Sequence, residues 1–213
     1  MKKNIILFVL LLGLSAFLFP ANQFSYTNSL ENKITFNHSP EFYEVEDGYT
    51  RLAKFGIGHA TDIGKPELPH FTTYFQIDPK KDYKFELEII DSYIVENINV
   101  LPHQGIDDSW DVEKIEIIDQ SIYNSSKFYP ENNLIVSERS QGRGIEFVSI
   151  QITPYSFYPQ DNTLEVYTSV NINIIESSSN LNNSLKQSKR SKIFDQLYQD
   201  MIINFQHSDR PED

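Results

Sequence analysis

Cysteine is absent from all 213 residues of this chain. The fold therefore contains no disulfide, and its stability must come from packing. The same absence excludes a thiolate nucleophile and a thiolate metal site within these residues. A packed core is still within reach, because 39% of the residues are hydrophobic and 13% are aromatic.

Basic residues are also scarce, with 18 Lys and Arg against 30 Asp and Glu. Without Lys2 and Lys3, which belong to the leader described next, 16 basic residues face 30 acidic ones, a net charge of −14. Phosphate backbones and anionic lipids repel such a surface. We therefore exclude nucleic acid as a favourable partner and expect a basic protein surface to be a better one.

The apolar run from Ile5 to Phe19 follows Lys2 and Lys3 and precedes Pro20-Ala-Asn22. This order of charged, apolar and polar residues is typical of a secretory signal peptide and predicts a leader over residues 1–21. The run is short for a bilayer span, so we expect no stable membrane anchor. A secreted, periplasmic or cell-surface protein is the expectation.

The long stretch from residue 144 to residue 174 is rich in β-branched and aromatic residues. Residues 144–153 and 164–174 are predicted to be the two strands of one long hairpin, with a turn at Pro154–Asn162. In the second strand, apolar side chains recur at every other position from Leu164 to Ile174, as in a half-buried strand.

A second alternating segment supports a sheet protein. Apolar residues at 83, 85, 87 and 89 alternate with charged ones, and this strand is predicted to pair with residues 93–100. Strands at this spacing, with no helical period between them, predict an all-β fold. We expect an antiparallel β-sandwich of jelly-roll-like outline over residues 24–176.

Past residue 176 the composition changes. Residues 177–192 form a polar and then basic linker, whose basic residues are Lys186, Lys189, Arg190 and Lys192. Over residues 193–213, two apolar stripes at i, i+4 spacing predict an amphipathic helix: Ile193, Leu197 and Met201 in one, and Phe194, Tyr198 and Ile202 in the other. We expect this helix to have nothing of its own to pack on and to lead into a further domain.

Two groups of potential metal ligands are better interpreted without a metal. The first is an acidic cluster that lacks the regular spacing and the pivotal glycine of a calcium loop: Asp107, Asp108, Asp111 and Glu113. The second consists of histidines with no pair at metal-ligand spacing: His38, His59, His70 and His103. No nucleophile elbow is present either, so we expect no metal, no cofactor and no enzymatic activity in this chain.

Several motifs occur in order along the chain: Gly64-Lys-Pro-Glu-Leu-Pro69, Val100-Leu-Pro102, Val148-Ser-Ile-Gln-Ile-Thr-Pro154, Leu164-Glu-Val-Tyr167 and Ile193-Phe-Asp-Gln-Leu-Tyr198. Together with the signal peptide, this layout resembles the N-terminal propeptide of gingipain-type cysteine peptidases, secreted enzymes of the Bacteroidota. The resemblance runs from about Phe42 to Phe205. It implies a β-sandwich that helps the peptidase to fold and blocks its cleft until it is cut away. The partner would be a gingipain-like catalytic domain, in cis or in trans, and the catalytic His and Cys domain itself is expected to be absent from this chain.

The resemblance also directs attention to two loops. A plug for an enzyme that cuts after basic residues would be an Arg or Lys, and Arg139 and Arg143 lie in a suitable loop; they can equally be ordinary hairpin residues. Lys186, Lys189, Arg190 and Lys192 are the candidates for the maturation cut, unless they only keep a linker soluble. The alternative function is an exported carbohydrate-binding or adhesion module, in which exposed Tyr and Trp would form a stacking platform.

Overall fold

The computed structural model describes residues 22–28, 31–45, 48–52, 58, 62–105, 117–178 and 191–206. The predicted leader, the acidic cluster at 107–113, and Lys186, Lys189 and Arg190 lie outside these ranges. The early strands are β1 (Gln23–Thr27), β2 (Lys33–Asn37), β3 (Tyr43–Glu44), β4 (Thr50–Arg51), β5 (Phe71–Ile77) and β6 (Lys81–Val95). After a short helix α1 (Gln120–Tyr123) come β7 (Leu134–Val136), β8 (Ser140–Gly142), β9 (Ile145–Ile152), β10 (Tyr155–Tyr158), the 3-10 turn η2 (Pro159–Asp161), β11 (Thr163–Ser178) and helix α2 (Lys192–Met201).

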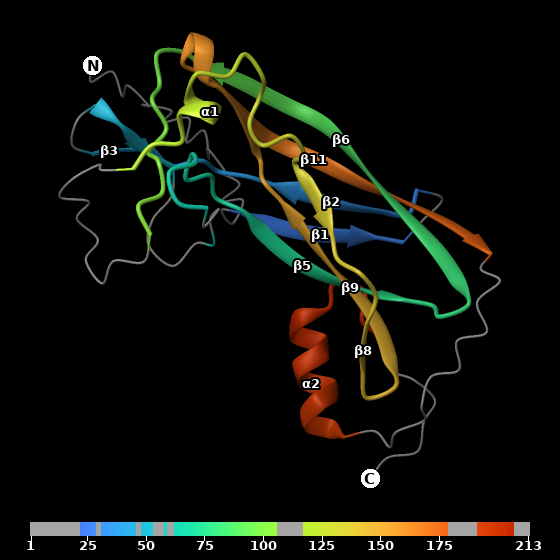
Figure 1. The fold of residues 1–213 in the computed structure, drawn as a ribbon. Helices are drawn as coiled ribbons and strands as arrows, with labels where there is room; N and C mark the ends of the chain where they lie inside the picture. The colour runs from blue at the N-terminus through green and yellow to red at the C-terminus, as the bar shows by residue number, and fades with distance from the viewer. Residues whose placement is uncertain are drawn as a thin grey trace, which may run out of the picture.

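Two antiparallel sheets make up most of the molecule (Figure 1). In the first sheet β11 pairs with β6 along one edge and with β2 and β10 along the other, and β1 pairs with β2. In the second sheet β9 pairs with β5 along one edge and with β7 and β8 along the other. The predicted antiparallel β-sandwich is confirmed. None of the helices in the described ranges is long and apolar enough to cross a membrane.

The core lies between the inward faces of these sheets. One cluster of buried side chains joins β2, β5, β9 and β11: Ile34, Phe75, Ile77, Val148, Ile150, Ile172 and Ile174. The alternation predicted for the last strand holds, since Leu164, Val166 and Val170 are fully buried in β11. Period-2 patterning therefore selects the face that each strand buries.

The predicted long hairpin is wrong, because β9 and β11 belong to different sheets. Pro154 follows β9 and has no backbone N–H to continue that ladder, so the chain crosses to the first sheet at this point. There β10, which lies within the predicted turn, forms the true hairpin with β11. Asn162, with φ 50°, closes it in the left-handed conformation that Asn tolerates.

β6 also differs from the prediction. It is one strand of 15 residues that pairs with β11 over nearly its whole length, and it does not turn back to pair with residues 93–100. Thr168 in β11 and Ile90 in β6 each lack a partner in the ladder, and these two irregularities cancel. The same face of β11 is therefore turned inward on both sides of the irregularity, with Val166 before it and Val170 after it fully buried.

The C-terminal helix does have a surface to pack on, contrary to expectation. α2 lies against the β8–β9 hairpin, with the ring centroid of Tyr198 6.4 Å from that of Phe147 in β9. The stripe of Phe194, Tyr198 and Ile202 faces the sheet, whereas Ile193 of the other stripe is 80% exposed. The sequence predicted both stripes but not the sheet face that receives one of them.

Candidate functional site: the bulged hairpin and its arginines

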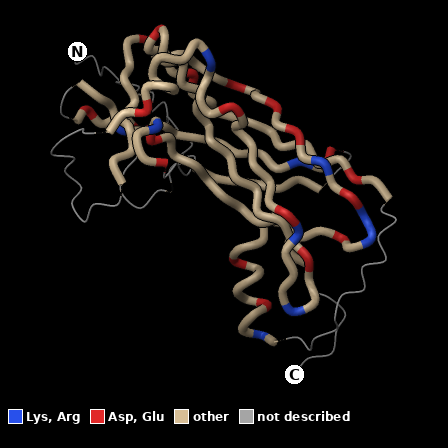
Figure 2. Tube along the Cα trace, viewed as in Figure 1, with Lys and Arg blue, Asp and Glu red and all other residues tan. Residues whose placement is uncertain are grey.

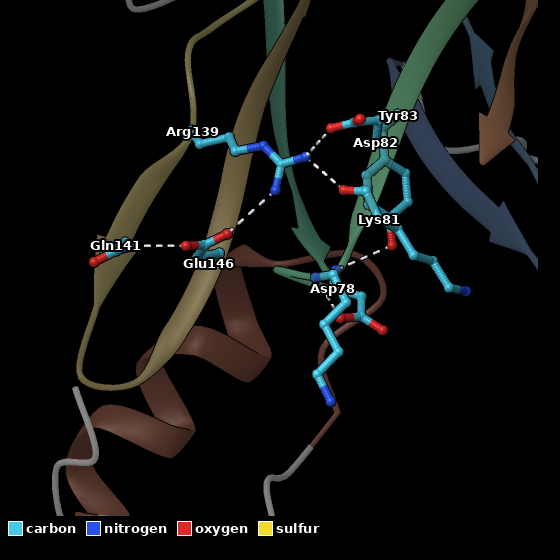
Figure 3. Close-up of polar contacts among 8 residues, drawn as sticks. Asp78, Lys81, Asp82, Tyr83, Arg139, Gln141 and Glu146 are labelled. Atoms are coloured by element: carbon cyan, nitrogen blue, oxygen red, sulfur yellow. Dashed lines mark hydrogen bonds and ion pairs between the residues drawn. The ribbon is translucent and has the colours of Figure 1, made fainter. Parts of the chain in front are cut away.

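Arg139 lies in a bulge between β7 and β8. Both strands pair with β9, but the register of β8 is shifted by one residue relative to that of β7. Ser137 keeps the strands together at the shift: its N–H donates to the Ser149 carbonyl at 3.0 Å, and its Oγ accepts from the Ser149 N–H at 2.9 Å. A bulge of this kind bends the strand and redirects a side chain. Here it directs Arg139 toward β6 (Figure 3).

The guanidinium of Arg139 joins the two sheets. Nη2 donates to the backbone carbonyl of Lys81 at 2.5 Å and to Asp82 Oδ1 at 3.0 Å, both in β6. Nη1 donates to Glu146 Oε2 in β9 at 3.4 Å. Figure 3 shows the side chain extended between these groups. Arg139 thus connects the start of β6 in the first sheet with the second sheet.

Glu146 is the buried member of this network, with only 1% of its side chain exposed. Its other oxygen accepts from Gln141 Nε2 at 2.6 Å. A buried carboxylate needs such partners, because an uncompensated charge in a packed interior is strongly destabilising. Arg139 therefore has a structural role, and it can enter a partner's groove only by giving up its contacts to β6 and Glu146.

Arg143 occupies the tip of the hairpin between β8 and β9. Arg143 and Gly144 both have positive φ, 43° and 80°. Two successive positive φ angles are the mark of the tight turn that matches the twist of a β-hairpin. The guanidinium carbon lies 3.9 Å from the ring centroid of Phe194 in α2, in a cation–π contact. The tip is thereby held against the helix.

The maturation candidates are placed only in part. Lys192 is the first residue of α2 and is exposed. Figure 2 shows Lys and Arg at the tip of the β8–β9 hairpin and at the start of α2, while Asp and Glu are spread along β6 with a few Lys among them. Arg143 and Lys192 therefore lie near the same end of the second sheet.

The histidines have separate structural surroundings. His38 is buried, its Nδ1 2.6 Å from Asn22 Oδ1 and its Nε2 2.7 Å from Tyr155 Oη, and burial lowers its pKa from 6.5 to about 4. His103 Nδ1 lies 3.5 Å from Glu67, which also pairs with Arg51 at 3.1 Å. His59 lies outside the described residues, and the backbone N–H of His70 donates to Gly58. No group of His, Asp and Glu within the described ranges could hold a metal ion.

Sequence reasoning missed the partners of Arg139. Glu146 is at an inward position of β9 by the same alternation that buries Val148, Ile150 and Ile152. A charged residue at an inward position signals a buried ionic partner, and this signal was available in the sequence. Asp82 gave no such signal, because its contact with Arg139 joins segments of two different sheets, 57 positions apart in the sequence.

The comparisons with known proteins agree on one family. The Propeptide_C25 family matches residues 23–210. Gingipain R1 of Porphyromonas gingivalis is 25% identical, over 78% of this chain and 17% of its own length. Gingipain R2 of the same species is 24% identical, over 97% of this chain and 31% of its own length. The chain thus spans less than a third of the length of these curated relatives.

Two solved structures share the fold. A complex of the pro- and mature domains of Porphyromonas gingivalis RgpB has a TM-score of 0.67 at 18% identity, covering 87% of this chain and 96% of that one. A structure concerned with the zymogenic latency of gingipain K from that species has a TM-score of 0.50 at 16% identity, covering 73% and 94%. Since the family match covers nearly the whole chain, and includes α2, this protein belongs to the Propeptide_C25 family of gingipain-type propeptides.

Proposed function

We propose that this propeptide inhibits a gingipain-like cysteine peptidase and assists its folding, in cis or in trans, outside the cytoplasm. The observation that carries the proposal is a paired β8–β9 hairpin that presents an arginine at its tip and belongs to a sandwich of the gingipain pro-domain fold. An inhibitor needs a preorganised segment, because a loop that is already ordered loses little entropy on binding.

Arg143 is the better of the two plug candidates. Arg139 is engaged by two groups of β6 and by the buried Glu146, so withdrawing it would leave that carboxylate unpaired. Arg143 is exposed at the hairpin tip, where its guanidinium lies over the Phe194 ring, and a cation–π contact at an exposed site is exchanged more readily than a contact to a buried carboxylate. A peptidase that cuts after basic residues would accept the Arg143 side chain in its specificity pocket.

The acidic surface would contribute to recognition. The whole chain carries a net charge of −12, and Asp and Glu are spread along β6. Complementary charge accelerates association and fixes orientation more than it raises affinity. The partner surface is therefore proposed to be more basic than this one, and association should slow as ionic strength rises.

Folding assistance would use the same surface as a template. A sandwich whose core joins β2, β5, β9 and β11 can fold without its partner and then offer a formed surface to the unfolded peptidase domain. A refolding assay tests this role: adding the folded propeptide to a denatured catalytic domain should raise the yield of active enzyme. An equal yield with serum albumin in place of the propeptide would refute it.

Maturation is proposed to occur by cleavage within the linker that contains Lys186, Lys189, Arg190 and Lys192. Hydrolysis adds one water across a peptide bond and leaves a carboxylate and an amine at the new ends. Cleavage in a linker between folded elements requires no strand to unfold, which favours this segment over the β8–β9 hairpin.

Inhibition by purified propeptide and its variants tests the main proposal. The wild-type chain should inhibit a gingipain-like peptidase, and Arg143→Ala should raise the inhibition constant at least tenfold. Lys127→Ala is the matched control and should inhibit like the wild type, because Lys127 is exposed and precedes Tyr129, which bridges to Phe157 in the first sheet. Equal inhibition by Arg143→Ala would refute the plug assignment, and no inhibition by the folded wild type would refute the inhibitor role.

The carbohydrate-binding alternative requires a platform of exposed aromatic rings. Among the described residues the exposed large aromatics are Phe42, Tyr93 and Phe128, which come from separate segments of the chain, whereas Tyr155 and Tyr167 are buried in the sandwich. The pKa of Tyr155 is raised by that burial, as expected for a phenol inside the core. Trp110 lies outside the described residues.

A further inference from the structure

The segment that follows α2 lies along the edge strand of the second sheet. β5 pairs with β9 on one side, and on its other side Tyr74 forms a parallel bridge with Ile202. The N–H of Ile203 donates to the Tyr74 carbonyl at 2.9 Å. A bare strand edge is a template for another extended segment, and here the chain's own C-terminal segment takes that place.

Asn204 extends this pairing with its side chain. Its Oδ1 accepts from the backbone N–H of Gln76 at 2.6 Å, and its Nδ2 donates to the Gln76 carbonyl at 2.9 Å. One amide group therefore satisfies both backbone groups of Gln76, as a neighbouring strand would. The N–H of Gln206 then donates to Gln76 Oε1 at 2.9 Å. Four hydrogen bonds thus connect residues 203–206 to Tyr74 and Gln76.

Apolar contacts hold the same segment to the sheet. Ile202 is buried, with 3% of its surface exposed. The ring of Tyr198 lies between those of Phe147 and Phe205, with centroid separations of 6.4 and 6.0 Å. Gly142 leaves room for this approach, because a Cβ there would lie 2.6 Å from the Tyr198 hydroxyl and would force that side chain to shift. α2 and the residues after it are therefore docked as one unit, separated from β11 in sequence by residues 179–190.

We propose that residues 191–206 form a retention clamp, which holds the chain together after the linker at 179–190 has been cut. A cut after Lys186, Lys189 or Arg190 would leave residues 191–206 whole, so it would remove none of the clamp's contacts; a cut after Lys192 would fall within α2 and is not part of this proposal. The role of the clamp in maturation rests on the proposed function, whereas the docking of residues 191–206 does not. Maturation would then take two steps, hydrolysis of the linker followed by undocking of α2 and residues 202–206 from β5 and β9. Cleavage of the linker alone would not separate the sandwich from the fragment that begins with residues 191–206.

The test uses the full chain with a recognition sequence for a site-specific protease inserted between Ser184 and Leu185. After complete cleavage, verified on a denaturing gel, the two fragments should co-elute on native gel filtration. The Asn204→Ala variant removes two of the four hydrogen bonds, and we expect it to dissociate at a protein concentration about tenfold higher than the unsubstituted chain does.

Leu197→Ala is the matched control. Leu197 lies on the same helix but faces away from the sheet, with 46% of its surface exposed, so its truncation should leave retention unchanged. Immediate separation of the cut, unsubstituted fragments would overturn the clamp, as would equal dissociation of Asn204→Ala and the unsubstituted chain. Because no peptidase is present, failure of the inhibitor proposal would leave this result unaffected.

Discussion

Replacing Arg139 by alanine should destabilise the fold, because the change leaves Glu146 buried without its cation. Removing one partner of a fully buried ion pair costs about 3–5 kcal/mol. Two features reduce this value here: the contact from Arg139 Nη1 to Glu146 Oε2 is long, at 3.4 Å, and Gln141 still donates to the carboxylate at 2.6 Å. We expect a loss of roughly 2–3 kcal/mol in the free energy of unfolding.

Urea unfolding followed by circular dichroism measures this loss, and for a chain of this size it corresponds to a fall in Tm of about 5–10 °C. Arg143→Ala is the matched control from the same hairpin, because Arg143 is exposed and its cation–π contact with Phe194 is worth about 0.5–1 kcal/mol. In the double variant Arg139→Ala/Glu146→Gln, a neutral amide replaces the stranded carboxylate, so stability should partly return. An Arg139→Ala variant within ~0.5 kcal/mol of the wild type, or a double variant less stable than the single one, would refute the argument.

Three further changes test other parts of the structure. Burial lowers the pKa of His38 to about 4, so between that value and 6.5 only the unfolded chain binds the proton; stability should fall as pH decreases through this window, by at most about 1.4 kcal/mol per pH unit, and His38→Gln should flatten the curve of Tm against pH. Val170→Asp places an unpaired charge at a fully buried site of β11 and should lower the free energy of unfolding by several kcal/mol, on the order of 3–5, in urea titrations. Limited digestion by a protease specific for basic residues should cut first within residues 186–192 and leave a core ending near Glu176; first cuts at Arg139 or Arg143 would move the proposed maturation site to the hairpin.

Local patterning was sufficient to predict the strands and their buried faces. The alternation in β11 and in the first half of β6 identified residues that do lie on the inward faces, such as Val170 and Phe85. Which strands pair was harder to predict, because pairing depends on partners distant in sequence. Strands that are adjacent in sequence are a reasonable first choice for a pair, but Pro154, which has no N–H to offer the ladder, separates β9 from the next strand.

The sequence predicted where the site lies along the chain, but it did not predict the contacts that the side chains of the site make. The sequence predicted that Arg139 and Arg143 lie in a loop, and the structure places Arg143 and Gly144 at a hairpin tip with two positive φ angles. The cation–π contact with Phe194 was not, because it requires α2 to return across residues 179–190 to the same sheet. No local pattern encodes that return, whose hydrogen bonds join Asn204 to Gln76 across 128 positions.

The central claim, that this propeptide inhibits a gingipain-like peptidase, is tested most directly by titrating the purified chain against a fixed concentration of active enzyme. The account predicts that activity falls with the propeptide concentration, approaches zero with excess propeptide, and returns when the propeptide is degraded. Full activity in the presence of a large excess of propeptide, whose circular dichroism spectrum still shows a folded β-protein, would contradict it.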